Sequence, residues 1–189
     1  MSDTIPHMLS RRSFAGGLLA APLAAAPPAD PADLTVSEAL ALLRQRKLTP
    51  IELTQACLKR VERLNPRLNA VVTLLSDQAL IRARSLHPSS ARTQALHGIP
   101  VALKDLYDTA GVRTTAASAH WRERVPTTDA IVVQRLQAAG SVLVGKANLD
   151  EFAYNFTSET SIFGASHNPW NPECSPGGSS GGSAIAVAR

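Results

Sequence analysis

A loop rich in glycine and serine is the first segment whose residue types could perform chemistry. It reads Gly-Gly-Ser-Ser-Gly-Gly-Ser over residues 177–183, and an apolar segment with helical character, residues 184–188, follows it directly. Glycine lets a backbone come close to another group, and serine supplies hydroxyls that can attack a substrate or relay a proton. The loop is therefore a candidate catalytic loop.

Three other interpretations of this loop remain open. A flexible linker has such a composition, although a linker is seldom followed at once by a compact apolar helix. A phosphate-binding loop requires Lys after its last glycine, whereas Ser183 follows Gly182 here. The spacing also fits the G-x-S-x-G elbow of hydrolases with Ser180 as nucleophile, but no strand directly precedes the loop.

Lys104 is the second feature that could perform chemistry. It ends a short apolar run, residues 101–103, that has the character of a buried strand. Burial disfavours the charged form of lysine and lowers its pKa, so that the neutral amine can accept a proton. The alternative is a solvent-facing strand end, because lysine side chains are usually exposed.

Lys146 also follows an expected strand, residues 141–144. We interpret it as a charge at a strand end, paired with Asp150 or Glu151. This pairing gives Lys146 a structural rather than a chemical role.

The cysteine and histidine residues do not predict a metal site or a disulfide framework. Cys57 falls on the apolar side of a helical pattern, and Cys174 lies in a loop. His97, His120 and His167 lack the spacing of metal ligands and are expected in loops or at edges. We therefore predict neither a metal ion nor a cofactor.

Two capping boxes predict helices near the start of the domain. Thr35 is followed three residues later by Glu, and Thr49 is followed by Pro50 at the first helical position and by Glu three residues after the cap. The second helix is expected to end at Asn65-Pro66. Two helices thus form an N-terminal hairpin.

Strand and helix patterns alternate after this hairpin. Residues 68–75 suggest a strand, 76–86 a helix, 101–103 a strand and 141–144 a further strand. A helix before that last strand is expected to begin at a Thr128 or Asp129 cap. Its predicted apolar face consists of Ile131, Val132, Leu136 and Ala139. The alternation predicts an α/β fold, with a mixed β-sheet flanked by helices.

Composition favours a folded chain without a nucleic-acid partner. Of its 189 residues, 44% are hydrophobic and 18% are charged, which excludes a disordered chain. The net charge is +4, but the arginines are scattered and do not form a basic block.

The N-terminus has the pattern of an export signal. Arg11 and Arg12 precede an apolar run, residues 14–26, that is too short to cross a bilayer, so we predict no stable membrane insertion. The pattern is of the twin-arginine type and predicts export to the periplasm, with a disordered basic tail in a cytoplasmic protein as the alternative. We assign residues 1–26 to the signal, 27–33 to a Pro/Ala-rich spacer and 34–189 to the globular domain.

Four segments together resemble the amidase signature family. They are "GIPVALKDLYDTAGVRTT", "DAIVVQRLQAAGSVLVGKANLDEFA", "SIFGASHNPWNP" and "SPGGSSGGSAIAVA", in the order and approximate spacing of the family. The resemblance implies hydrolysis of carbon–nitrogen amide bonds through an acyl-enzyme. It also implies a small-molecule amide substrate and leaves the oligomeric state open.

The resemblance assigns roles to individual residues. The family uses a triad of Ser, a second Ser beside a cis peptide bond, and Lys. By position in the motifs, Lys104 corresponds to the base and Ser179 to the bridging Ser, with the cis bond after Gly178. Candidate substrate-binding residues are Ala153, Tyr154, Gly178 and Ser180.

The attacking Ser of the family lies about two dozen residues beyond the bridging Ser, in a D-x-G-G-S turn that also forms the oxyanion hole. Only ten residues follow Ser179 in this sequence. We therefore expect residues 34–189 to be an incomplete amidase domain that is inactive alone. The alternatives are the glutamine-hydrolysing subunit of a tRNA-dependent amidotransferase, which works with partner subunits, and a non-catalytic remnant of an amidase.

Overall fold

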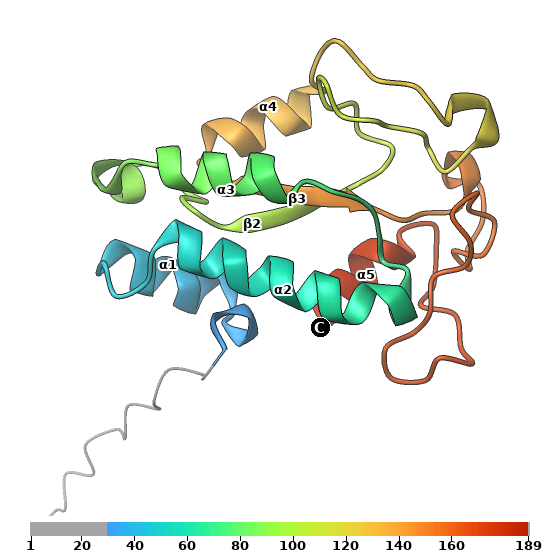
Figure 1. Ribbon diagram of the computed structural model, residues 1–189, viewed down its shortest axis with the longest axis horizontal. Helices are drawn as coiled ribbons and strands as arrows, with labels where there is room; N and C mark the ends of the chain where they lie inside the picture. Colours follow the sequence, from blue (N-terminus) through green and yellow to red (C-terminus); the bar gives the residue numbers. More distant parts are fainter. Residues whose placement is uncertain (1–29, 189) are drawn as a thin grey trace, which may run out of the picture.

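A three-stranded mixed sheet lies at the centre of the computed structural model, which describes residues 30–188 (Figure 1). The strand order is β1-β3-β2, where β1 is Val71–Leu74, β2 is Pro100–Lys104 and β3 is Val142–Ala147. β2 runs parallel to β3, and β1 runs antiparallel to it. The mixed α/β architecture predicted from the sequence is confirmed.

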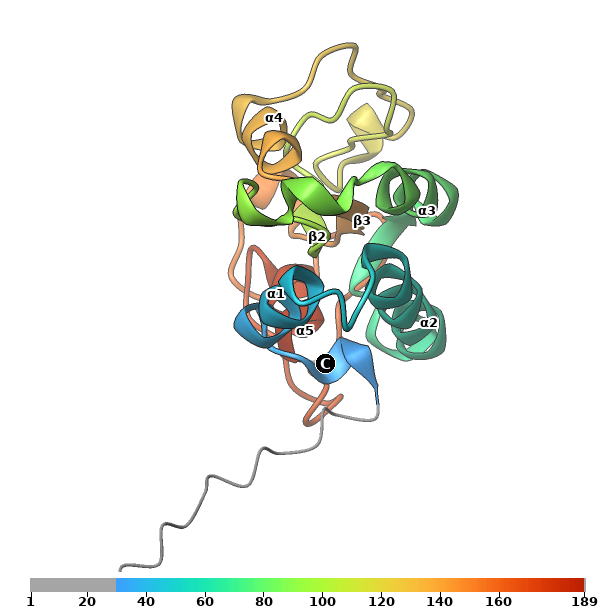
Figure 2. The same cartoon turned by 90° about the vertical axis from the view of Figure 1, so that its left-hand side faces the viewer.

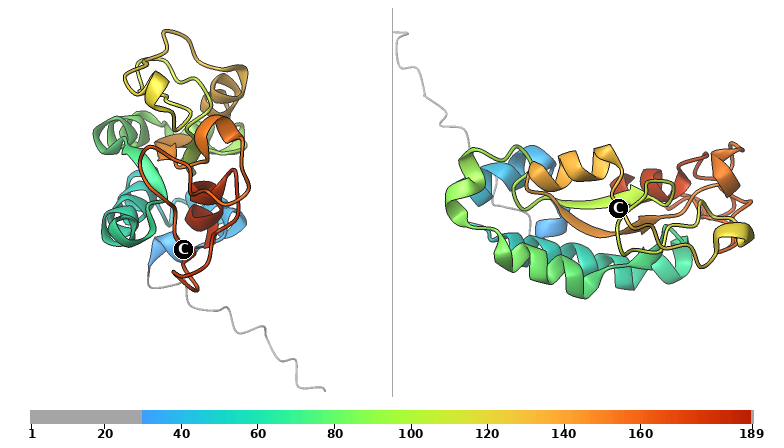
Figure 3. Two further views of the ribbon diagram at one scale, coloured as in Figure 1. Left: turned by 90° about the vertical axis from the view of Figure 1, so that its right-hand side faces the viewer. Right: turned by 90° about the horizontal axis from the view of Figure 1, so that it is seen from above.

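Helices flank this sheet on both sides. They are α1 (Val36–Arg44), α2 (Pro50–Leu68), α3 (Ser76–Ser85), α4 (Ile131–Ala138) and α5 (Gly181–Ala188). Short 3-10 helices are η1 (Pro31–Asp33), η2 (Pro88–Arg92), η3 (Ala119–Trp121) and η4 (Glu151–Ala153). In the right-hand view of Figure 3, α2 and α3 run along one side of the strands, and α4 and α5 lie along the other.

The first two helices begin where the capping boxes predict. The Thr35 and Thr49 hydroxyls each accept a hydrogen bond from the main-chain N–H three residues later, and both boxes are closed by the glutamate carboxylates. The predicted end of α2 at Asn65-Pro66 is wrong. The helix continues to Leu68, whose side chain is buried, and Pro66 removes only one main-chain donor.

The predicted start of α4 is also wrong, and its predicted apolar face is wrong in part, since Leu136 and Ala139 are partly buried. Its N-cap is Ala130, because the Asp129 carboxylate accepts a hydrogen bond from the main chain of Ala110 in a neighbouring loop at 2.7 Å. The helix therefore buries Val133, whereas Ile131 is 68% exposed and Val132 is also exposed.

Three clusters of buried apolar side chains hold the layers together. The first joins α1 and α2 to the segment before β2, and the second joins α2 and α3 to β3. The third cluster contains Leu68, Ala70, Val71 and Ile185, and it joins α5 to α2 and β1. Because α5 is anchored in the core, the glycine-rich loop that leads into it is fixed against the sheet.

The predicted export signal, residues 1–26, lies outside the described residues. Part of the predicted spacer is described, and η1 packs against α2 below the sheet (Figure 2). Arg60 of α2 holds it through ion pairs with Asp30 at 2.6 Å and Asp33 at 2.8 Å. Within residues 30–188, none of the helices combines the length and apolar character needed to span a bilayer.

Candidate active site

Lys104 and Ser179 meet at the end of β2. The Lys104 Nζ donates a hydrogen bond to the Ser179 Oγ at 2.7 Å. Lys104 is the last residue of its strand and is partly buried, while Ser179 lies just before α5. Burial lowers the pKa of the Lys104 amine, and the nearby Asp150 carboxylate partly offsets this effect. The site thus pairs a hydroxyl with an amine that is biased toward its neutral form.

The peptide bond between Gly178 and Ser179 is cis, as the family resemblance implies. The Ser179 carbonyl accepts a hydrogen bond from the main-chain N–H of Asp150 at 3.2 Å. The cis bond therefore lies directly before Ser179, the candidate bridging residue.

Close packing explains three of the four glycines of the loop. A Cβ atom at Gly178 would meet the Asp150 carboxylate, and one at Gly181 would meet the Ser158 hydroxyl. A Cβ at Gly182 would meet the main chain of two neighbouring segments. The loop is therefore a tightly packed segment and not a flexible linker.

Two serine hydroxyls fix the loop on both sides of Ser179. The Ser158 Oγ donates to the Gly177 carbonyl and accepts from the Gly181 N–H, each at 2.9 Å. The Ser175 Oγ donates to the Thr157 carbonyl at 2.7 Å. These contacts hold the Ser179 hydroxyl where the Lys104 amine reaches it.

The candidate substrate-binding residues occupy two segments. Gly178 and Ser180 flank Ser179, and Ser180 is exposed. Ala153 ends η4 with a left-handed φ of 58°, and the Tyr154 side chain that follows is 92% exposed. The structure thus leaves the Tyr154 ring accessible from solvent.

The predicted partner of Lys146 is wrong. β3 extends to Ala147, so Lys146 lies inside the strand and its side chain is fully buried. Its amine lies 3.4 Å from the Asp105 carboxylate and donates to the Thr114 hydroxyl at 2.6 Å and the Tyr107 carbonyl at 2.8 Å. Lys146 therefore fastens the loop that follows Lys104.

Three polar residues were not predicted to belong to the site, although Asp150 was predicted as a possible partner of Lys146. Asp105 and Asp150 are fully buried carboxylates, and Ser158 is a buried hydroxyl. In the sequence, only their positions mark the two carboxylates: Asp105 directly follows the Lys at the end of β2, and Asp150 follows shortly after β3.

The cysteines and histidines contribute no cluster of metal ligands. Across residues 30–188, His, Cys, Asp and Glu side chains form no group of three that could hold an ion. Burial raises the pKa of the Cys57 thiol to about 11, and Cys174 is exposed. His97 lies in a turn, as expected, but its ring is buried and bonds to Gln94.

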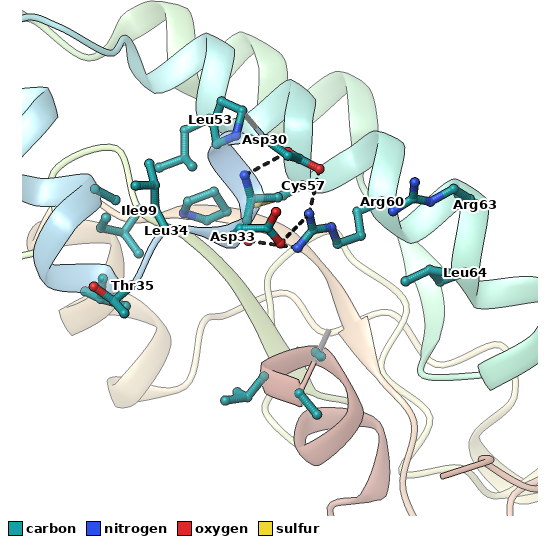
Figure 4. A pocket seen from close by; sticks show the side chains of 18 of the residues that line it. Asp30, Asp33, Leu34, Thr35, Leu53, Cys57, Arg60, Arg63, Leu64 and Ile99 are labelled. Atoms are coloured by element: carbon teal, nitrogen blue, oxygen red, sulfur yellow. Dashed lines mark hydrogen bonds and ion pairs between the residues drawn. The ribbon is translucent and has the colours of Figure 1, made fainter. Parts of the chain in front are cut away.

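A large groove of about 1050 Å³ lies apart from this pair (Figure 4). Its lining includes η1, Arg60 of α2 and the end of α5, but neither Lys104 nor Ser179. Ion pairs with Asp30 and Asp33 neutralise Arg60 within the groove.

Comparison with known proteins places the chain in a family. The sequence model of the Amidase family matches residues 52–189, and the chain belongs to this family. The matched segments contain both members of the Lys104–Ser179 pair.

Three relatives illustrate the range of similarity. A glutamyl-tRNA(Gln) amidotransferase subunit of Geotalea daltonii is 48% identical over 158 residues, which cover 82% of this chain and 33% of the relative. The crystal structure of the same subunit from Thermotoga maritima has a TM-score of 0.69 with 37% identity, covering 85% of this chain and 32% of that one. The peptide amidase of Stenotrophomonas maltophilia has a TM-score of 0.73 with 38% identity, covering 82% and 34%.

The chain spans about a third of the length of these relatives.

Proposed function

We propose that this protein hydrolyses carbon–nitrogen amide bonds and that Lys104 and Ser179 handle the proton of that reaction. The observation that carries the proposal is the 2.7 Å contact between the Lys104 amine and the Ser179 hydroxyl. In its neutral form the amine accepts the Ser179 proton, while Ser179 takes the proton of the attacking hydroxyl. The same contact then returns the proton toward the leaving nitrogen.

The proposal requires a nucleophile that the family resemblance locates in a D-x-G-G-S turn. Residues 1–189 contain no such turn. We therefore propose that these residues alone form no acyl-enzyme and show no steady turnover of amides. Ala153, Tyr154, Gly178 and Ser180 are proposed to contact the substrate once the site is complete.

Reading the DNA beyond codon 189, in all frames, tests whether the turn is encoded downstream. A chain extended through that turn should release ammonia or amine from simple aromatic and aliphatic amides. Lys104→Met and Ser179→Ala should lower its turnover about 10²–10⁴-fold. Full turnover by the Lys104→Met variant would remove Lys104 from the mechanism. An unrelated gene directly downstream would favour the non-catalytic remnant.

A second candidate is the glutamine-hydrolysing subunit of a tRNA-dependent amidotransferase. It is favoured by the 48% identity to the Geotalea daltonii protein. The chemistry at Lys104 and Ser179 is the same, but the substrate is glutamine and the protein works with partner subunits. The extended chain should then release ammonia from glutamine only when partner subunits and charged tRNA are present. Turnover of simple amides by the isolated chain would instead favour the first candidate.

A further inference from the structure

Asp150 is a fully buried carboxylate next to Gly178 and Ser179. Its main-chain N–H donates to the Ser179 carbonyl at 3.2 Å. Its side chain packs against Gly178, where a Cβ atom would meet the Oδ2 atom. One residue thus fixes both ends of the Gly178–Ser179 dipeptide.

The same carboxylate organises the neighbouring loop. Its Oδ2 accepts from the Ser158 N–H at 2.8 Å, and its Oδ1 accepts from the Glu159 N–H at 3.0 Å and the Thr160 hydroxyl at 3.0 Å. Burial alone would raise the pKa of Asp150, but these hydrogen bonds outweigh it and lower the pKa. Asp150 therefore stays charged over the range in which a lysine ionises.

The loop held by Asp150 in turn holds the glycine-rich loop. Ser158, whose N–H binds the carboxylate, bridges the Gly177 carbonyl and the Gly181 N–H through its hydroxyl. Asp150 thus reaches the main chain on both sides of Ser179, directly through one peptide group and indirectly through Ser158.

Asp150 is the acidic residue whose charge acts on the Lys104 amine. The buried Asp105, which follows Lys104 in the chain, pairs with Lys146 of β3 at 3.4 Å. Glu151 is partly exposed and Glu159 is exposed. Asp150 supplies the attraction that partly offsets the burial of the Lys104 amine.

We propose that Asp150 is the positioning residue of the Lys104–Ser179 pair: it fixes the main chain around Ser179 and supplies the charge against which the Lys104 amine gains and loses its proton. This inference rests on the proposed function. A base that must accept a proton and return it works best when its pKa lies near the working pH. Burial lowers the pKa of the Lys104 amine below the ordinary lysine range, and the Asp150 charge limits this decrease.

The test compares Asp150→Asn with Glu151→Gln in the 189-residue chain. Asparagine keeps the shape of the side chain and removes its charge, whereas Glu151→Gln removes the same charge from the adjacent residue. Competitive acetylation followed by mass spectrometry gives the pH at which each amine becomes reactive, with the exposed Lys59 as internal reference. We call the pH at which half of Lys104 is reactive toward acetylation the Lys104 midpoint. We expect this midpoint to fall by about one pH unit in Asp150→Asn and to stay unchanged in Glu151→Gln.

Amide hydrogen exchange tests the positioning role in the same samples. Residues 158–160 should lose protection in Asp150→Asn and keep it in Glu151→Gln. An Asp150→Asn chain with the wild-type Lys104 midpoint, or with unchanged protection of residues 158–160, would overturn the inference.

A measurement on the wild-type chain covers the case in which Asp150→Asn does not fold. The ¹³C carboxyl resonance of Asp150 should show an inflection at the Lys104 midpoint, because coupling between two ionising groups is reciprocal. Lys104→Met should abolish the inflection, and its absence from the wild type would refute the coupling. These readouts need no turnover, so an amidase that keeps full activity without Lys104 would contradict the proposed function and leave this result standing.

Discussion

The amine of Lys104 and the hydroxyl of Ser179 lie 2.7 Å apart although 75 residues separate them in the sequence. The contact forms because β2 ends at Lys104 and the packed loop before α5 crosses that strand end. The carboxyl ends of parallel strands are common places for sites in α/β proteins. β2 and β3 run parallel here, and their ends contribute Lys104 and the segment that contains Asp150.

The pH dependence of turnover should follow the ionisation of Lys104. Its pKa is lowered by burial, and below that pKa the amine carries a proton and cannot accept another. In a chain that also carries the D-x-G-G-S turn, kcat/KM should therefore rise with pH and level off below the ordinary lysine range. A pH–rate profile from about pH 5 to 10 measures this rise in kcat/KM. A rate that falls over this range would contradict the assignment of Lys104 as base.

Removing the buried Lys146 charge should strongly destabilise the fold. Lys146→Met leaves the Asp105 Oδ1 atom, which accepts no hydrogen bond, without its ion-pair partner. Loss of one partner of a buried pair typically costs about 3–5 kcal/mol in the free energy of unfolding. Urea unfolding measures the change, with Lys59→Met on the exposed face of α2 as control. Equal stability of the two variants would show that the pair is not needed to hold the loop.

A methyl group added at Gly182 should disturb the packing of the glycine-rich loop, residues 177–183. The added Cβ would meet the main-chain oxygen of Ala70 and the main chain of Asn148. Overpacking of this kind typically costs about 1–3 kcal/mol. Thermal unfolding of Gly182→Ala should show a clear loss of stability relative to Ser183→Ala, the next position of α5. An unchanged unfolding midpoint would mean that the loop is less tightly packed than described.

Export should depend on the two arginines at the start of the sequence. We propose that residues 1–26 direct the protein to the periplasm, where the twin-arginine pattern acts as an address that a receptor reads. Arg11→Lys combined with Arg12→Lys should reduce the periplasmic fraction of a reporter fusion to background. Arg44→Lys combined with Arg46→Lys is the matched control. Equal distribution of the two fusions would favour a cytoplasmic protein.

Local sequence patterns predicted most of the elements around the site. The capping boxes at Thr35 and Thr49 act within a few residues, so their outcome could be read from the chain alone. The end of α2 and the start of α4 could not, because burial of Leu68 and the bond from Ala110 to Asp129 depend on segments brought together by folding.

Only part of the site was predicted, because local patterns do not show contacts that form on folding. Lys104 and Ser179 were found through their motifs, and the structure brings them together. The partner of Lys146 was missed because pairing with β2 extends β3 beyond the apolar run that marks it in the sequence. Asp150 was predicted only as a possible partner of Lys146, and its place at the site was missed because its contacts come from residues 158–160, which reach it only through the fold.

A double-mutant cycle on turnover tests the central claim most directly, in a chain that carries the D-x-G-G-S turn. The variants are Lys104→Met, Ser179→Ala and their combination, with Lys59→Met and Ser183→Ala as controls. Residues that act as one unit show strongly non-additive effects. We expect each single change to lower kcat by about 10²–10⁴-fold and the double change to lower it no further. Losses that multiply in the double variant, or full activity in either single variant, would contradict a shared role in proton transfer.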